Sequence, residues 1–194
     1  MGQGKQAKVL SDGQIKAALS FIETTRYPLR DRAIFLLSLK AGLRAKEIAS
    51  LQWWMVTDPE GNLSDALHLD DQASKGRSGR TIPMHGQLIA ALEALKLDTK
   101  VSPDDYVILS ERGSQMRASS MVNWFQRLYQ SLAFSGCSPH SGRRTFVTVA
   151  SQKVSLAGGS LRDVQQLAGH ASLNTTQRYT EGNSEAKRKL IGLI

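Results

Sequence analysis

Apolar side chains in the first fifty residues recur with the spacing of a helix. They predict one helix that begins at Ser11 or Asp12, where a short polar side chain can cap the first turn. A second helix is expected from Pro28, which suits a first helical turn, to Gly42, which ends it. A third, short helix is expected over 43–51. The N-terminal part of the chain is therefore predicted to be helical.

The pattern changes from position 53 onward. Three short segments have the residue types of strands and are separated by turns rich in Asp, Gly and Ser. They are 53–57, 66–69 and 81–84. This pattern predicts a small three-stranded antiparallel sheet or ribbon, which interrupts the helical part of the chain.

Helical patterns return in the second half of the chain. The expected helices cover 85–96, 117–134, 140–153, 161–167, 172–180 and 184–190. The predicted fold class is thus α+β, mainly α-helical with a small three-stranded antiparallel sheet. We expect a loose lead-in at 1–10, one domain at 11–180 and a C-terminal tail at 181–194.

The composition is that of a globular protein with an apolar core. The 194 residues are 41% hydrophobic and 22% charged, which excludes a disordered tail and fits one domain. The single cysteine, Cys137, excludes an internal disulfide framework and a cysteine-rich zinc site, and we interpret it as a spectator. No apolar run approaches the roughly 18–20 residues that cross a bilayer. The single cysteine fits a reducing compartment, so we expect a cytoplasmic protein.

Positive charge is concentrated in the C-terminal half. The whole chain has a net charge of +8, and residues 110–194 carry 11 basic residues against 4 acidic ones, a net charge of +7. A basic half beside a nearly neutral half favours a polyanionic partner, and nucleic acid is the first candidate. A basic chain that is merely soluble is the alternative.

Four clusters carry side chains suited to chemistry on a phosphate. In the first, Arg44 and Glu47 are three residues apart and share a helix face. Glu47 would orient the Arg44 guanidinium to grip a phosphate, and a solvated ion pair is the alternative. The second is the turn that holds Lys75, Arg77 and Arg80. A lysine on such a turn can enter a DNA groove and protonate a leaving oxygen, and a solvated turn lysine is the alternative.

The third cluster opens the helix at 140–153. His140 and Arg143 project to the same side there, and the helix N-terminus favours a bound phosphate. Arg144 points elsewhere and is expected to contact a backbone or to be a surface charge. The fourth cluster is His170, in a Gly-His dipeptide, and Tyr179 nine residues later. A capping histidine, a helix end and a packed tyrosine are the alternative interpretations.

Together and in this order, the clusters resemble the active-site series of the tyrosine recombinases, the phage-integrase family. The matching stretches are Ala-Gly-Leu-Arg-x-x-Glu-Ile, His-x-x-Arg-Arg-Thr-Phe and Ala-Gly-His-x-Ser-x-x-Thr-Thr-x-Arg-Tyr. The resemblance covers the chain from about Ser11 to the tail, and it implies the tyrosine recombinase catalytic-domain fold. Members usually carry a separate N-terminal helical domain that helps to clamp DNA. We therefore expect weak DNA affinity for this chain on its own.

The resemblance implies a site-specific DNA recombinase or integrase, from a bacterial or phage context, that works without metal or ATP. Tyr179 attacks a phosphodiester and becomes joined to the 3′ phosphate, a 5′ hydroxyl leaves, and the 5′ hydroxyl of a partner strand reverses the step. Two arginines and His170 stabilise the transition state, His140 is the base and Lys75 the acid. The six residues implied for catalysis are Arg44, Lys75, His140, Arg143, His170 and Tyr179.

Further expectations concern support and partners. Glu47 supports Arg44, and the candidates for contacts to the DNA backbone are Arg77, Arg80, Arg144 and Arg178. No cofactor and no metal are expected, because no acidic cluster has the pattern of a magnesium site. The expected partner is double-stranded DNA, on which the chain forms a homo-oligomer, a tetramer. The tail at 181–194 packs either on a neighbouring subunit or on its own core.

Three other functions compete with this hypothesis. A type IB topoisomerase shares the chemistry but acts without a specific site. A non-catalytic DNA-binding or regulatory integrase fragment would bind DNA reversibly. A metal-dependent nuclease would need a carboxylate cluster, which the sequence lacks.

Overall fold

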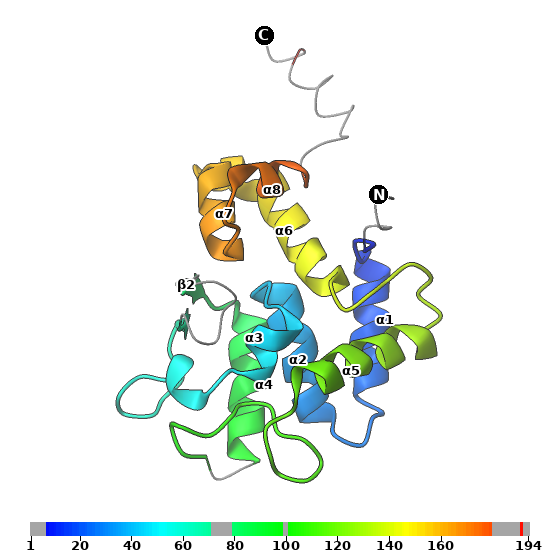
Figure 1. The fold of residues 1–194 in the computed structure, drawn as a ribbon, viewed down its shortest axis with the longest axis vertical. Coiled ribbons are helices and arrows are strands. Elements are labelled where there is room, and N and C mark those ends of the chain that lie inside the picture. Colours follow the sequence, from blue (N-terminus) through cyan, green and yellow to red (C-terminus); the bar gives the residue numbers. More distant parts are fainter. Residues whose placement is uncertain (1–6, 71–78, 99–100, 180–190, 192–194) are drawn as a thin grey trace.

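The computed structural model describes residues 7–70, 79–98, 101–179 and 191. These parts form eight α-helices, two 3₁₀ helices and one two-stranded sheet (Figure 1). The α-helices are α1 (Asp12–Ile22), α2 (Pro28–Lys40), α3 (Ala45–Ala49), α4 (Gly86–Leu97), α5 (Ala118–Ser131), α6 (Ser141–Lys153), α7 (Leu161–Ala168) and α8 (Leu173–Gln177). The 3₁₀ helices are η1 (Trp53–Met55) and η2 (Val154–Ala157), and the strands are β1 (Ala66–Leu69) and β2 (Arg80–Pro83). The mainly helical class with a small antiparallel sheet is confirmed.

Local side chains explain where the first helices begin and end. The Ser11 hydroxyl accepts from the Gln14 amide, and the Gln14 side chain accepts from the Ser11 amide, so Ser11 is the N-cap of α1. Pro28 occupies the first turn of α2. Gly42 follows α2 with φ +64°, and a Cβ there would lie 2.4 Å from the ring of Phe146. Glycine is therefore required both by the backbone conformation and by the close approach of α6.

The main core surrounds α2. Every residue from Ala33 to Leu37 is fully buried, so the middle of this helix is enclosed on all sides rather than on one face. It packs against α4 and α6, and α3 packs against α5. Figure 1 shows α1 to α5 gathered into the larger part of the molecule, with α2 in its interior.

The predicted third strand is wrong. Residues 53–55 form η1, and the sheet has only β1 and β2 within the described residues. The amides of Trp53 and Trp54 donate to carbonyls of the 103–105 loop, while those of Met55 and Val56 donate locally, three residues back. Trp53, Met55 and Val56 are buried in the core, and the segment's pairing is limited to an isolated antiparallel bridge between Thr57 and Leu63. β1 and β2 pair antiparallel, with Leu67 opposite Ile82.

The remaining helices form a second layer. A small apolar cluster of Val147, Val164 and Ala168 joins α6 and α7, and Tyr179 packs against it. Figure 1 shows α6, α7 and α8 together at one end of the molecule. The eight α-helices correspond to eight of the predicted ones, while the predicted helix at 184–190 lies outside the described residues. Across those residues, every helix is too short or too polar to span a lipid bilayer.

Candidate active site

A buried carboxylate organises the first cluster. Glu47, in α3, is 1% exposed, and its Oε1 accepts from Arg44 Nη1 at 2.8 Å while its Oε2 accepts from the Arg44 backbone amide at 2.8 Å. The predicted contact is therefore present, and it is not a solvated surface pair. Arg44 keeps 30% of its side chain exposed. Glu47 thus fixes the orientation of the Arg44 guanidinium, and part of the Arg44 side chain stays accessible to solvent.

Arg80, at the start of β2, binds the same carboxylate. Arg80 Nη1 and Nη2 each lie 3.1 Å from one oxygen of Glu47, and the Arg80 side chain is only 6% exposed. Burial by itself raises the pKa of Glu47, but the hydrogen bonds and charges of Arg80 and Arg44 outweigh it and lower that pKa below its usual value. Glu47 is therefore ionised at neutral pH. An arginine this buried has little surface that DNA could reach. Its burial disfavours the contact to the DNA backbone that we expected for Arg80.

Three arginines meet the C-terminal end of α7. Arg80 Nε donates to the Leu167 carbonyl at 2.9 Å, Arg143 Nη2 to Ala168 at 2.6 Å, and Arg44 Nη2 to Gly169 at 3.4 Å. The last carbonyls of a helix have no partner within it and carry partial negative charge. Three guanidinium groups from β2, α6 and the start of α3 thus converge on one helical turn.

His170 directly follows this turn. Gly169, with φ +61°, ends α7 in the left-handed conformation and directs the chain away from the helix axis. The His170 Nδ1 atom lies 3.0 Å from Thr176 Oγ1, and Thr176 is completely buried. Burial, followed by the charges of Arg143, Arg44 and Arg80, lowers the pKa of His170 to about 4. The imidazole is therefore neutral at neutral pH.

Tyr179 stands against His170. The two rings are parallel within 17° and their centroids are 5.8 Å apart. The guanidinium of Arg144, a residue of α6, lies 5.8 Å from the centroid of the Tyr179 ring. The Tyr179 amide donates to the Thr176 carbonyl, so the tyrosine follows α8 in a turn. The predicted fourth cluster is thus brought together by α7 and α8.

The N-terminus of α6 supplies the third cluster. His140 is the exposed N-cap residue of α6, and Arg143 is buried in its first turn, where Nη1 donates to the Gly42 carbonyl at 2.5 Å. Burial lowers the pKa of Arg143 to about 10, so the group stays cationic at neutral pH. Both residues line a cleft of about 390 Å³. Its lining consists of Ala7, Ser138, His140, Arg143, Arg144, Thr175, Arg178 and Tyr179.

The family model described as the phage integrase family matches residues 8–186. The chain belongs to the phage integrase family. The resemblance seen in the sequence is thereby confirmed.

Individual relatives agree with this membership. The integrase-family chain is 32% identical over 184 residues to the tyrosine recombinase XerA of Thermococcus onnurineus, covering 94% of this chain and 61% of the relative. It is 32% identical over 185 residues to the tyrosine recombinase XerC of Myxococcus xanthus, covering 90% and 58%. The chain thus spans about 60% of the length of these curated relatives.

Solved structures share the fold. A crystal structure of XerA recombinase superimposes with a TM-score of 0.74 at 24% identity, over 100% of this chain and 65% of that chain. A lambda integrase dimer bound to a COC′ core site gives a TM-score of 0.69 at 17% identity, over 95% and 50%. The predicted tyrosine recombinase catalytic-domain fold is therefore confirmed.

Some predicted residues lie elsewhere than expected. Lys75 and Arg77 fall within 71–78, outside the described residues. Arg144 was expected to point away from His140 and Arg143, yet it lines the same cleft and lies against Tyr179. Arg178 is exposed and also lines the cleft. Successive side chains on an α-helix point in directions about 100° apart. This rule predicted the wrong direction for the Arg144 side chain.

Two contacts in the integrase-family site were missed from the sequence. Nothing in the spacing indicates that Thr176 binds His170, or that Arg80 shares Glu47 with Arg44. Arg80 and Glu47 are 33 residues apart in the chain. His170 follows α7, whereas Thr176 lies in α8. The sequence did carry one signal, since Thr176 is the second threonine of the Ala-Gly-His-x-Ser-x-x-Thr-Thr-x-Arg-Tyr stretch.

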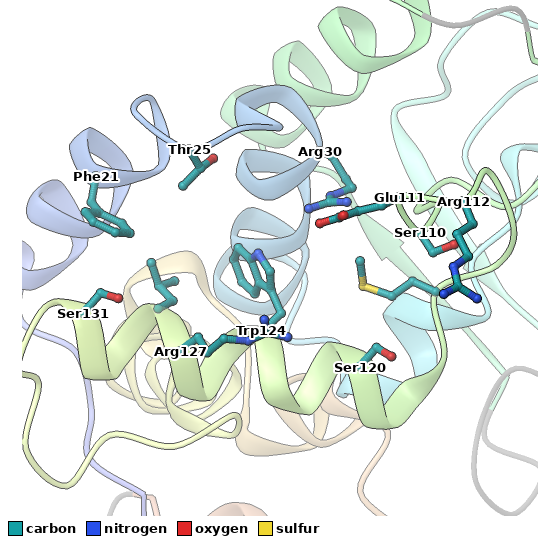
Figure 2. Close-up of a pocket in the computed structure, with 12 residues that line it drawn as sticks. Phe21, Thr25, Arg30, Ser110, Glu111, Arg112, Ser120, Trp124, Arg127 and Ser131 are labelled. Atoms are coloured by element: carbon teal, nitrogen blue, oxygen red, sulfur yellow. The ribbon is translucent and has the colours of Figure 1, made fainter.

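A second cleft lies on another part of the integrase-family domain. It has a volume of about 380 Å³ and lies between α1, α2, the 110–116 loop and α5. Figure 2 shows Trp124 rising from α5 toward Arg30, with Arg112 and Arg127 at either side. The Arg30 guanidinium is already held by Asp31 at 2.9 Å. No histidine, cysteine or tyrosine is among the residues that line this cleft.

The chemistry available is therefore that of cations and a phenol. The described ranges contain no group of three or more His, Cys, Asp or Glu side chains that could hold a metal ion. The end of α7 and the adjoining cleft together hold two guanidinium groups bonded to one helix end, a neutral imidazole and a tyrosine. Guanidinium groups and imidazole N–H donors suit a phosphodiester.

Proposed function

We propose that this chain is the catalytic domain of a site-specific DNA recombinase that cleaves and rejoins double-stranded DNA through Tyr179. The observation that carries the proposal is the end of α7, where Arg44 and Arg143 are attached to the turn that precedes His170, and the His170 ring stacks on Tyr179. Family membership supports it, as do relatives named as tyrosine recombinases.

The proposed step conserves the phosphodiester bond energy. The Tyr179 oxygen attacks the phosphorus, the phenol–phosphorus bond forms and the bond to the 5′ oxygen breaks, which leaves a 3′-phosphotyrosine. The phenol proton passes to His140, and the leaving 5′ oxygen takes a proton from Lys75. A 5′ hydroxyl of a partner strand then attacks the phosphotyrosine and releases Tyr179. The part given to Lys75 rests on the sequence.

Negative charge developing on the phosphate meets fixed positive charge. Arg44 and Arg143 supply this positive charge without a metal ion, and their hydrogen bonds to α7 limit their movement. His170 is neutral, so it acts as a hydrogen-bond donor rather than as a cation. We assign its proton to Nε2, with the Thr176 hydroxyl donating to Nδ1. This tautomer leaves a ring N–H free for a phosphate oxygen.

The DNA is expected to lie across the cleft at the start of α6. Arg144 and Arg178 line this cleft and are candidates for contacts to the DNA backbone, together with Arg77. Such contacts position a duplex and make binding depend on salt. We infer that the chain assembles on DNA as a homo-oligomer, a tetramer in the complete reaction. A lambda integrase dimer on a core site and XerH bound to difH are related assemblies.

Covalent trapping on a nicked suicide duplex tests the proposal. The wild-type chain at low salt should give a band shifted by covalently attached DNA, in the presence of EDTA. Tyr179→Phe should give none, and Tyr27→Phe, a tyrosine outside the cleft, should trap like wild type. Sequencing the trapped DNA from random duplexes should return a preferred site.

Each alternative has its own outcome. Reversible, salt-sensitive binding without a covalent band would favour a non-catalytic DNA-binding or regulatory fragment. Relaxation of supercoiled DNA with no preferred site would favour a type IB topoisomerase. Cleavage that EDTA abolishes would favour a metal-dependent nuclease. Each of these results overturns the recombinase proposal.

A further inference from the structure

Arg80 is buried at the point where the parts of the site meet. Its guanidinium donates to both oxygens of Glu47 at 3.1 Å and to the Leu167 carbonyl at 2.9 Å. These acceptor atoms belong to α3 and to the last turn of α7, while Arg80 itself begins β2. One planar group therefore ties three segments together.

The backbone of the Gly-His dipeptide packs directly on this guanidinium. A Cβ added to Gly169 would lie 2.7 Å from Arg80 Nη1 and 3.0 Å from its central carbon. The turn that carries His170 thus rests on Arg80 with no space for a side chain between them. Displacing Arg80 removes the support beneath that turn.

Arg80 also shares its partners with the arginines proposed to bind phosphate. Glu47 Oε1 accepts from both Arg80 and Arg44. The Leu167, Ala168 and Gly169 carbonyls accept from Arg80, Arg143 and Arg44 in turn. The Arg80 guanidinium makes a bidentate ion pair with Glu47 and also a hydrogen bond to α7. The Arg44 guanidinium bonds Glu47 through one nitrogen, and Arg143 bonds backbone carbonyls. It is therefore placed to set the positions of the other two.

We propose that Arg80 is a positioning residue of the strand-cleavage site, which fixes the Glu47 carboxylate and the C-terminal turn of α7 and, through them, Arg44 and His170. This inference rests on the proposed function for its catalytic consequence. A direct contact between Arg80 and DNA does not fit, because the side chain is 6% exposed and its fork is engaged by Glu47.

The charge of Arg80 acts on His170 as well. Burial is the largest cause of the low pKa of His170, and the charges of Arg143, Arg44 and Arg80 add to it. A neutral residue at position 80 should therefore raise the pKa of His170 toward its ordinary value. A lysine should keep the charge but cannot bridge both Glu47 oxygens and the Leu167 carbonyl. The two substitutions separate the charge of Arg80 from its geometry.

The test compares Arg80→Gln and Arg80→Lys with Arg26→Gln. Arg26 is 78% exposed on the α1–α2 connection, so its variant controls for the loss of one positive charge. Single-turnover trapping at saturating DNA gives the cleavage rate, and a titration of labelled DNA gives the affinity. NMR of the four histidines, with His170 assigned from His170→Gln, gives the pKa of His170 without DNA.

The expected pattern differs from that of a DNA contact. Both Arg80 variants should cleave about 100-fold more slowly at saturating DNA, as misplaced groups do, with affinity within about twofold of wild type. The pKa of His170 should rise in Arg80→Gln and stay low in Arg80→Lys. Arg26→Gln should match wild type in every measurement.

Three results would overturn the inference. They are wild-type cleavage rates at saturating DNA in both variants, a loss confined to DNA affinity, and loss of the folded structure in both variants. The last would make Arg80 a requirement of the whole fold rather than of the site. If the wild-type chain forms no covalent complex, the proposed function fails, and the histidine titration still tests whether Arg80 acts on His170.

Discussion

The Glu47→Gln substitution removes the one negative charge on which two buried or half-buried arginines converge. Glu47 accepts four hydrogen bonds, from the Arg44 amide and Nη1 at 2.8 Å and from Arg80 Nη1 and Nη2 at 3.1 Å. Glutamine has nearly the same shape. One of its terminal atoms, however, is a donor that faces other donors. The arginine charges then lack a counterion in a site where Arg80 is buried and Arg44 is only partly solvated.

The structure sets the size of this effect. Breaking a buried ion pair by neutralising one partner costs about 3–5 kcal/mol, because the remaining charge stays buried. Arg80 is 6% exposed and takes the full penalty, whereas Arg44 is 30% exposed and is partly solvated. We therefore expect a loss of about 3 kcal/mol at neutral pH. For a chain of this size that lowers the unfolding temperature by about 6–12 °C.

The pH dependence gives the sign of the effect. The pKa of Glu47 is lowered below its usual value of 4.5 in the folded chain. Its stabilising contribution is therefore fully present above pH 4.5, and it is lost as the pH falls through the lower, folded-state pKa. The difference between wild type and Glu47→Gln should shrink in that acidic range.

Urea unfolding followed by circular dichroism, from pH 7 to about pH 3.5, measures this difference. Glu23→Gln is the matched control, because Glu23 is 69% exposed and lies 3.6 Å from Arg32. Its effect should stay within about 0.5 kcal/mol. The reasoning is refuted if Glu47→Gln is as mild as the control at pH 7, or if its cost is unchanged at the acidic end.

Three further predictions concern the end of α7. The free energy of unfolding of wild type should fall more steeply than that of His170→Gln between pH 6.5 and about pH 4, because folded His170 binds its proton only near pH 4; parallel curves in urea titrations would contradict this. Gly169→Ala should cost about 1–3 kcal/mol more than Gly158→Ala, since both glycines have positive φ but only Gly169 packs on Arg80; equal unfolding midpoints would exclude the clash. Thr176→Val should slow strand cleavage by about five- to tenfold, the value of one hydrogen bond, at unchanged DNA affinity; an unaffected rate in the trapping assay would remove Thr176 from the site.

The helices could be predicted because their signals are local. Ser11 caps α1 through Gln14, three residues away, and Gly42 ends α2 through its own backbone conformation. The third strand could not, because a strand exists only when a second segment supplies its hydrogen bonds. Residues 53–57 have the residue types of a strand, but 53–55 form the 3₁₀ helix η1 and Thr57 makes only an isolated bridge to Leu63.

The candidate site divides in the same way. Arg44 with Glu47, and His140 with Arg143, were predictable because three-residue spacing places side chains on one helix face or turn. The sharing of Glu47 by Arg80, the support of His170 by Thr176 and the position of Arg144 against Tyr179 were not.

The sequence by itself determined the helices, the family and the residue types required for phosphate chemistry, since these depend on spacing within a few turns and on ordered motifs. The tertiary structure decided which guanidinium groups are buried, which carboxylate they share and that His170 is neutral. Those properties depend on burial and on charges contributed by α3, β2, α6 and α7 to one helix end. Both electrostatic energy and desolvation are set by distance in space, which spacing along the chain does not specify.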